Sequence, residues 1–117
     1  MLKRFQRIRL ANEYKSILKK GQRYYSKYFI FFVLNNSQEK TRFGFIASKK
    51  VGGAVVRNAS KRRLREIVRK NLAYINFGVD AVFIISPELP KANHRQLTLE
   101  VKKVLKSAGL LRVDLPG

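Results

Sequence analysis

The chain has 117 residues, and its 26 Lys and Arg against 7 Asp and Glu give a formal net charge of +19. Hydrophobic residues make up 45% of the chain, which is too many for a disordered basic tail. One folded basic domain over residues 1–117 is therefore expected, with nucleic acid as the favoured polyanionic partner.

Several other classes are disfavoured by the same composition. There is no cysteine, so the sequence offers neither a disulfide framework nor a thiolate metal site. No apolar stretch approaches the roughly 20 residues of a membrane span, and the first ten residues (MLKRFQRIRL) lack the apolar centre of a secretory signal. We expect a cytoplasmic protein with no membrane partner.

The first predicted elements are a short helix and two strands. The helix covers about 13–20 and ends at Gly21, a residue suited to a left-handed C-terminal position. An aromatic-rich segment at 23–34 (RYYSKYFIFFVL) is typical of a strand. Residues 42–48 (RFGFIAS) read as a second strand that pairs back on the first through a hairpin.

The segment at 49–71 (KKVGGAVVRNASKRRLREIVRKN) places two glycines before a basic amphipathic helix. At about 100° per residue, one sector of this helix holds the core candidates Ser60, Leu64, Ile67, Val68 and Asn71. Another sector holds Asn58, Lys61, Arg62, Arg65 and Arg69. Solvated helix faces usually mix charges of both signs, whereas this helix carries one acid. The pattern therefore favours contact with RNA or DNA over a merely solvated face.

The last predicted elements are a strand and a helix. The continuous apolar run at 81–85 (AVFII) is typical of a strand buried on both faces. Asn93 and Gln96 resemble a capping box before a helix that Gly109 can end. The order of helix, strands, helix, strand and helix predicts an α+β domain with helices packed on one sheet.

Residues for hydrolytic chemistry do not gather in this sequence. The single histidine, His94, opens the last helix among polar residues, and the seven acids are scattered. Protein-based hydrolysis would need a carboxylate cluster, metal-ligating histidines or a nucleophile with its base. We therefore expect neither a catalytic residue nor a metal site in the protein.

The basic segment resembles the signature of the protein subunit of bacterial ribonuclease P, roughly S-x-K-x-G-x-A-V-x-R-N followed by K-R-x-x-R-E. The matching residues are Ser48, Lys50, Gly52, Ala54, Val55, Arg57, Asn58, Lys61, Arg62, Arg65 and Glu66. The resemblance extends to R-L-x-N-E-Y at 9–14 and G-x-D at 78–80. In two places the chain departs from the family: Ala59 replaces the last arginine of an Arg-Asn-Arg triplet, and Ser86 and Pro87 stand where many relatives carry an arginine.

The resemblance implies a small α+β domain of order αβββαβα (ribosomal protein S5 domain 2-like), with a mixed sheet and a left-handed βαβ crossover. General rules alone would favour a right-handed crossover in about 98% of cases. The implied function is that of the RNA-binding subunit of a ribonucleoprotein endonuclease that removes the 5′ leader from precursor tRNA. The implied partners are ribonuclease P RNA, which would contain the catalytic centre and bind most of the magnesium, and precursor tRNA, with no obligate protein partner.

Two RNA-binding surfaces follow from the resemblance. The residues expected to bind the RNA subunit are Lys49, Lys50, Gly52, Arg57, Asn58, Lys61, Arg62, Arg65 and Arg69. Those expected to bind the single-stranded leader are Tyr14, Leu18, Ile30, Phe32, Ser48 and Lys50. Aromatic strand residues belong more often to a core, and because both faces of the 28–33 strand are apolar, alternation does not indicate which face is exposed.

Other classes share part of this evidence. A ribosomal protein or an RNA chaperone would show the same charge and the same lack of catalytic residues, and the signature at 50–66 is what favours ribonuclease P. A duplex-DNA binder is less favoured because the sequence shows neither a helix-turn-helix pair nor zinc-ligand spacing. A membrane-surface helix would need larger apolar residues on its apolar face.

Overall fold

A computed structural model describes residues 6–7, 11–36, 41–71 and 78–111. The elements along the chain are β1 (Gln6–Arg7), α1 (Ala11–Lys20), β2 (Gln22–Tyr25), β3 (Phe29–Asn35), β4 (Arg42–Ala47), α2 (Ala54–Lys70), β5 (Val79–Ile85), the 3₁₀ turn η2 (Leu89–Lys91) and α3 (His94–Ser107). After the two-residue strand β1, this is the expected αβββαβα order.

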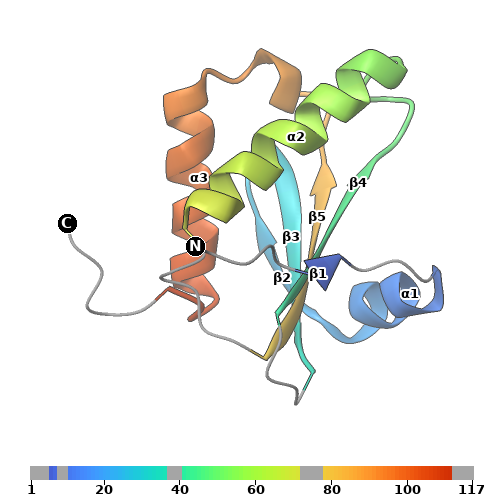
Figure 1. Cartoon of the computed structure of the whole chain (residues 1–117), viewed down its shortest axis with the longest axis vertical. Coiled ribbons are helices and arrows are strands. Elements are labelled where there is room, and N and C mark those ends of the chain that lie inside the picture. The colour runs from blue at the N-terminus through green and yellow to red at the C-terminus, as the bar shows by residue number, and fades with distance from the viewer. Residues whose placement is uncertain (1–5, 8–10, 37–40, 72–77, 112–117) are drawn as a thin grey trace.

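The strands form one mixed sheet in the order β1-β4-β5-β3-β2. Strand β3 runs antiparallel to β2 and β5, while β4 runs parallel to β5 and β1. Helix α1 lies on one face of the sheet, and α2 and α3 lie on the other (Figure 1). The fold therefore has three layers, with a different helix set on each face.

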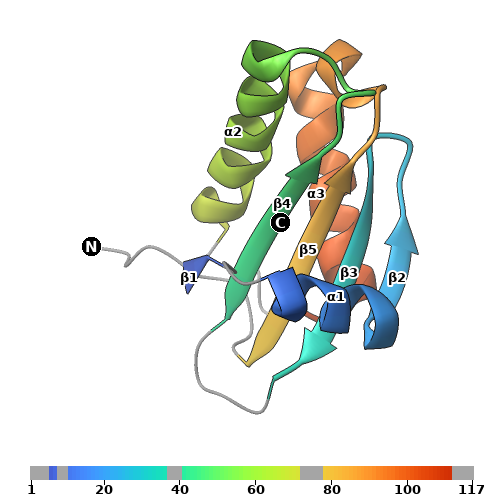
Figure 2. The same cartoon turned by 90° about the vertical axis from the view of Figure 1, so that its right-hand side faces the viewer.

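The β4-α2-β5 unit is a left-handed crossover. Figure 2 looks at the sheet from the α1 side, where β4 and β5 both run upward, β5 lies to the right of β4 and α2 lies behind the sheet. Seen from the α2 side, the chain therefore steps to the left. This confirms the handedness that the resemblance implied, against the general preference for right-handed crossovers.

The strand pairing differs from the sequence prediction in two ways. The aromatic segment at 23–34 forms two strands, because residues 26–28 make a turn in which the Ser26 amide donates to the Phe29 carbonyl at 2.9 Å. The expected hairpin between the aromatic strand and the 42–48 strand is wrong, since β5 lies between β3 and β4. A strand that is apolar on both faces gains most from a central position in the sheet, and β5 takes it.

Gly21 ends α1 for a reason other than the predicted one. Among the described glycines, only Gly52, Gly78 and Gly109 have positive φ, so Gly21 is not the left-handed cap that we expected. A Cβ atom at Gly21 would lie 2.6 Å from the Ile17 carbonyl oxygen and 3.0 Å from the Val33 carbonyl oxygen. Glycine is needed there because the end of the helix presses on β3.

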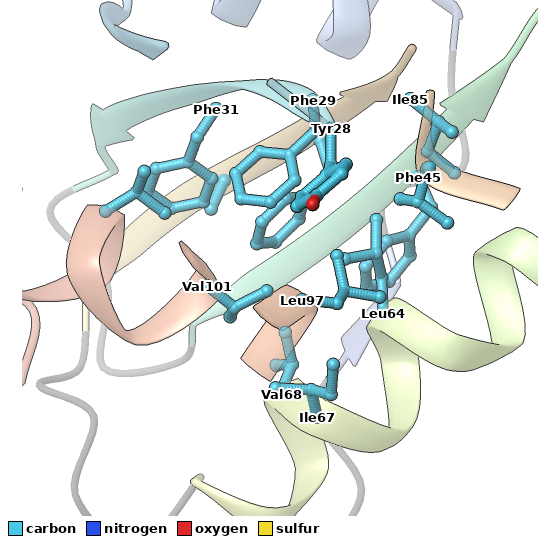
Figure 3. Packing of buried hydrophobic residues seen from close by; sticks show 14 of the residues in the cluster. Tyr28, Phe29, Phe31, Phe45, Leu64, Ile67, Val68, Ile85, Leu97 and Val101 are labelled. Carbon is cyan, nitrogen blue, oxygen red and sulfur yellow. The ribbon is translucent and has the colours of Figure 1, made fainter. Parts of the chain in front are cut away.

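The main core lies between the sheet and the two helices α2 and α3. Its centre is a group of phenylalanine rings, in which Phe83 lies 4.7 Å from Phe31, 5.1 Å from Phe29 and 5.5 Å from Phe45 between ring centroids. Leucines and valines from both helices close over these rings (Figure 3). The predicted N-cap of α3 is confirmed for Asn93, whose side chain accepts a hydrogen bond from the Gln96 backbone amide at 2.8 Å. The Gln96 side-chain oxygen accepts instead from the Tyr28 hydroxyl at 3.1 Å.

Candidate nucleic-acid interface

Helix α2 packs on the core with the predicted sector. Ser60, Leu64, Ile67, Val68 and Asn71 are all buried. The side chains of the two polar members both find partners within the helix. The Ser60 hydroxyl donates to the Val56 carbonyl at 2.9 Å, and the Asn71 side-chain amide donates to the Ile67 carbonyl at 2.8 Å. The rotation of α2 about its axis is therefore fixed, and the sector that does not pack is presented outward.

That outward sector is cationic. Asn58, Arg62 and Arg69 are exposed, and Lys61 and Arg65 are half-buried. The Arg65 guanidinium lies over the Phe45 ring of β4, 5.7 Å from the ring centroid, which fixes the sector beside the β4 end of the sheet.

Within this sector the charges are not equivalent. Arg69 donates to both carboxylate oxygens of Glu66, at 2.5 and 2.7 Å. These hydrogen bonds hold the pKa of Glu66 below its ordinary value. Arg69 is therefore partly neutralised, and Lys61 and Arg62 make up most of the charge that a phosphate backbone would meet.

Arg63 has a structural role that the sequence did not indicate. Its guanidinium donates to the Leu89 carbonyl at 3.1 Å and to the Ala92 carbonyl at 2.7 Å, and so fastens the η2 turn to α2. On the helical wheel Arg63 lies outside both the core and the cationic sectors. Only the position of η2, which is a long-range feature, explains why this cation differs from its neighbours.

The loop before α2 presents two exposed lysines, Lys49 and Lys50, on a tight turn. The Val51 amide donates to the Ser48 carbonyl at 3.0 Å, and the Gly52 amide donates to the Lys49 carbonyl at 3.2 Å. Gly52 has a φ of 150°, and a Cβ atom there would lie 2.9 Å from the Val56 side chain. The turn itself therefore requires this glycine, which is the structural alternative to close phosphate approach.

The face of the sheet under α1 carries a second, smaller apolar cluster. Ile17, Phe32 and Val82 are its buried centre, and its half-buried rim is Tyr14, Leu18, Ile30, Leu34, Ile46 and Ile84. The side chains of β3 at 30, 32 and 34 thus face α1, while those at 29, 31 and 33 face the main core. Sequence alternation could not indicate which face of this strand is more exposed, and the structure shows that it is the face under α1.

The predicted leader residues fall into three groups by position and exposure. Tyr14 and Leu18 of α1 and Ile30 of β3 are half-buried, whereas Ser48 and Lys50 are exposed beyond the end of β4. Phe32 is only 5% exposed, with the Arg23 guanidinium 5.5 Å from its ring centroid. Phe32 therefore supports the face from below and presents little surface of its own.

Beside α1, the half-buried isoleucines form a continuous row. Ile30 of β3 pairs in register with Ile84 of β5, and Ile84 pairs with Ile46 of β4. Residues paired directly across neighbouring strands project on the same face. We call Ile30, Ile84 and Ile46 the isoleucine row. Its β4 end lies two residues before Ser48, so the row and the cationic loop are close in the chain.

An ion-pair network anchors α1 to the sheet. Arg42 at the start of β4 donates to Asp80 of β5 through Nε (2.9 Å) and Nη2 (2.6 Å), and to Glu13 of α1 through Nη1 (2.5 Å). Asp80 also accepts from the Asn36 amide at 2.8 Å. Burial alone would raise the pKa of Asp80, but the hydrogen bonds from Arg42 and Asn36 outweigh it and hold that pKa below its ordinary value.

A close contact between Tyr14 and Gly44 fixes the same helix. A Cβ atom at Gly44 would lie 2.6 Å from Cε1 and 2.7 Å from the hydroxyl oxygen of Tyr14, so the tyrosine ring rests on the bare backbone of β4. Burial, and to a smaller extent the charge of Glu13, raises the pKa of Tyr14. Tyr14 and Arg42 therefore fix the position of α1 beside the isoleucine row.

The described residues contain no group of three or more His, Cys, Asp or Glu that could hold a metal ion. Nor does the described part of the chain include a helix long and apolar enough to span a membrane. The fold, the cationic helix and the left-handed crossover together define a small basic α+β domain of the class that binds RNA.

The chain belongs to the ribonuclease P protein family, whose model (Ribonuclease P) matches residues 2–109. It is 34% identical over 110 residues to the ribonuclease P protein component of Syntrophomonas wolfei, covering 94% of this chain and 92% of the relative. It is 44% identical over 102 residues to that of Finegoldia magna, covering 87% and 82%. As a family member it is a subunit of ribonuclease P and serves in tRNA 5′ processing.

Solved structures agree with this assignment. The RNase P protein of Staphylococcus aureus superposes with a TM-score of 0.82 at 29% identity, over 91% of this chain and 97% of that one. The RNase P protein of Thermotoga maritima superposes with a TM-score of 0.79 at 29% identity, over 87% and 96%. The predicted fold class and family are confirmed, and the ribosomal-protein and chaperone alternatives give way to a component that associates with ribonuclease P RNA.

Proposed function

We propose that the protein binds ribonuclease P RNA through α2 and the loop at 48–53, and binds the single-stranded 5′ leader of precursor tRNA on the α1 face. The RNA subunit contains the catalytic centre and binds most of the magnesium. The complex works in the cytoplasm without an obligate protein partner. The observation that carries this proposal is the presence of two different surfaces, one cationic and one apolar, with residues 48–50 between them in the chain.

The cationic surface suits a folded RNA because its charges lie along one side of a rigid helix. Lys61 and Arg62 have no acid beside them in their sector, and the loop lysines Lys49 and Lys50 extend the same charge beyond the helix. Phosphate contacts of this kind position a protein without reading sequence. Binding of this kind would depend on the shape of the RNA subunit and not on its base sequence.

The α1 face suits an unpaired strand. Single-stranded RNA is bound by apolar and aromatic platforms that contact bases, together with cations that follow the backbone. The isoleucine row and the α1 residues Tyr14 and Leu18 supply the first, and Lys50 and Arg23 supply the second. Because the described cluster on this face is almost entirely apolar, binding should depend little on leader sequence.

The catalytic role of the RNA is supported by the chemistry that the described part of the protein lacks. Hydrolysis of a phosphodiester by two metal ions needs several carboxylates in one place, whereas three of the five described acids pair with arginines: Asp80 and Glu13 with Arg42, and Glu66 with Arg69. The protein then contributes binding energy and position, and the RNA supplies the metal-binding groups.

The first test is cleavage of a precursor tRNA at low magnesium by a bacterial ribonuclease P RNA, with and without the protein, beside a protein-only reaction. Leader removal that appears only when both subunits are present supports the proposal. Cleavage by the protein alone would contradict the assignment of the catalytic centre. An unchanged rate, despite binding of the RNA, would contradict the cofactor role.

The second test separates the cationic surface from general charge. Arg62→Ala should weaken binding of the RNA subunit and lower the slope of log K against log salt by about 0.7–0.9, the release expected for one lost phosphate contact. Lys102→Ala removes the same charge from an exposed position on the neighbouring helix α3, outside the cationic sector, and is the matched control. Equal changes in slope for both variants would refute the α2 assignment.

A further inference from the structure

Tyr25 has an unusual position for a large aromatic residue. It is 69% exposed and lies at the end of β2, the strand at one edge of the sheet. Its neighbour Tyr24 faces the other way, with its ring centroid 6.4 Å from that of Phe31 in the main core. Tyr24 thus has a packing role, and Tyr25 has none comparable.

The side of the sheet on which Tyr25 projects follows from its neighbours. Arg23, two residues earlier on β2, has its guanidinium over Phe32 on the α1 face. Residues two apart on a strand project on the same face. Tyr25 also pairs in register with Ile30, the first member of the isoleucine row. The Tyr25 ring therefore lies on the α1 face.

Tyr25 extends the isoleucine row to a fourth strand. The order Tyr25, Ile30, Ile84, Ile46 crosses β2, β3, β5 and β4. With neighbouring strands about 4.8 Å apart, the row spans roughly 14 Å. The β4 end lies beside the loop proposed to bind the RNA subunit, so Tyr25 is at the end farthest from that subunit.

The surroundings of Tyr25 favour a nucleic acid strand as the occupant. Arg23 is exposed on the same face as Tyr25, and no acid pairs with it among the described ion pairs. Lys27, by contrast, lies over the Tyr28 ring on the main-core side, 6.0 Å from its centroid. An exposed aromatic ring beside a cation is an arrangement on which an unpaired base can stack while its phosphate is neutralised. A single exposed tyrosine without a role is the alternative, and the test below separates the two.

We propose that Tyr25 is a base-stacking position for the 5′ leader at the β2 end of the row, so that it contributes only to leaders long enough to cross the whole sheet. This rests on the proposed function, since it requires the leader to bind on the α1 face. The leader would enter at β4, beside the RNA subunit, and reach Tyr25 last. Tyr25 then makes the affinity for precursor tRNA depend on leader length.

The experiment measures the affinity of the assembled holoenzyme for mature tRNA and for precursor tRNAs whose leaders are lengthened one nucleotide at a time. Tyr25→Ala should lower affinity for long leaders by roughly 5- to 140-fold, the fold-change that corresponds to about 1–3 kcal/mol of stacking per base. Affinity for the shortest leaders and for mature tRNA should not change. Tyr25→Phe should behave as the wild type, because stacking needs the ring and not the hydroxyl.

Leu99→Ala is the matched control, because Leu99 is 58% exposed on α3, on the opposite side of the sheet. Abasic substitutions along the leader add a second readout. At one leader position, removal of the base should lower the affinity of the wild-type holoenzyme. The same removal should not lower the affinity of the Tyr25→Ala holoenzyme any further. Urea unfolding of each variant checks that the fold is retained.

Two outcomes would overturn the inference. In one, Tyr25→Ala binds every leader length as the wild type does. In the other, it weakens mature and precursor tRNA equally. These differ from failure of the proposed function, which would show as a wild-type holoenzyme whose affinity is the same with and without a leader. If affinity depends on the leader and falls on Ile30→Ala but not on Tyr25→Ala, the α1 face stands and only the role of Tyr25 is refuted.

Discussion

Replacement of Arg42 by methionine tests whether the ion-pair network holds α1 in place. Methionine keeps most of the length and apolar stem of arginine but cannot donate any of the three hydrogen bonds to Asp80 and Glu13. The Asp80 side chain is only 8% exposed, so its carboxylate would remain largely buried without its cation. The substitution should therefore destabilise the protein and loosen α1.

The magnitude follows from burial. Removal of one partner from a buried pair costs about 3–5 kcal/mol, because the remaining charge is uncompensated. The Arg42 side chain is 19% exposed, so water can reach part of the site, and we expect a loss of about 3 kcal/mol, at the lower end of that range. Glu13→Gln should cost less than about 1 kcal/mol, since Glu13 is more exposed and glutamine still accepts a hydrogen bond.

Urea unfolding at pH 7 measures these free energies. The double variant Arg42→Met, Asp80→Asn is the informative control, because it removes the buried charge together with its partner. Its free energy of unfolding should exceed that of Arg42→Met alone by about 1–2 kcal/mol, as expected for residues in direct contact. The reasoning is refuted if Arg42→Met costs less than about 1 kcal/mol, or if the double variant is no more stable than the single one.

Three further predictions concern the same scaffold. Arg63→Met should cost about 1–3 kcal/mol of stability, because two hydrogen bonds to carbonyls are lost. Its salt slope of RNA-subunit binding should stay nearer to the wild type than that of Arg62→Ala. Equal slopes for these two variants would contradict the structural role of Arg63. Gly44→Ala should displace the Tyr14 ring and cost about 1–3 kcal/mol of stability. It should weaken the binding of precursor tRNA but not of mature tRNA. Gly53→Ala is the control: its Cβ would meet nothing within 4 Å, so it should cost under about 1 kcal/mol. Because the pKa of Asp80 is lower in the folded than in the unfolded state, its stabilising contribution is complete above about pH 4 and is lost as pH falls through the folded pKa. Unfolding free energies between pH 7 and pH 3 should therefore fall less steeply for Asp80→Asn, and parallel curves would count against the network.

The local elements were predictable because their signals are local. The spacing of Leu64, Ile67 and Val68 identifies the buried side of α2 without any knowledge of what it packs against. The N-cap at Asn93 fixes the start of α3 in the same way. The strand order was not predictable, because the position of β5 between β3 and β4 depends on contacts between segments far apart in the chain.

The candidate site was predictable to the same extent. The cationic sector of α2 followed from the helical period, and the structure shows it facing outward, with Arg62 and Arg69 exposed and Lys61 and Arg65 half-buried. The division of the aromatic segment by a turn at 26–28 was not visible, because the aromatic residues on both sides of the turn favour a strand. Without that turn, neither the face of Tyr25 nor its register with Ile30 could be derived.

The placement of α1 and α2 on opposite faces makes the sheet a spacer of fixed thickness (Figure 1). Strands β3 and β5 are packed on both faces, and the phenylalanine rings leave no hinge between the two helical layers. In the proposed holoenzyme, a leader bound on one face would be kept at a constant distance from the RNA held beside the other. The protein would then set the position of the substrate through the fixed dimensions of its fold and not through a conformational change.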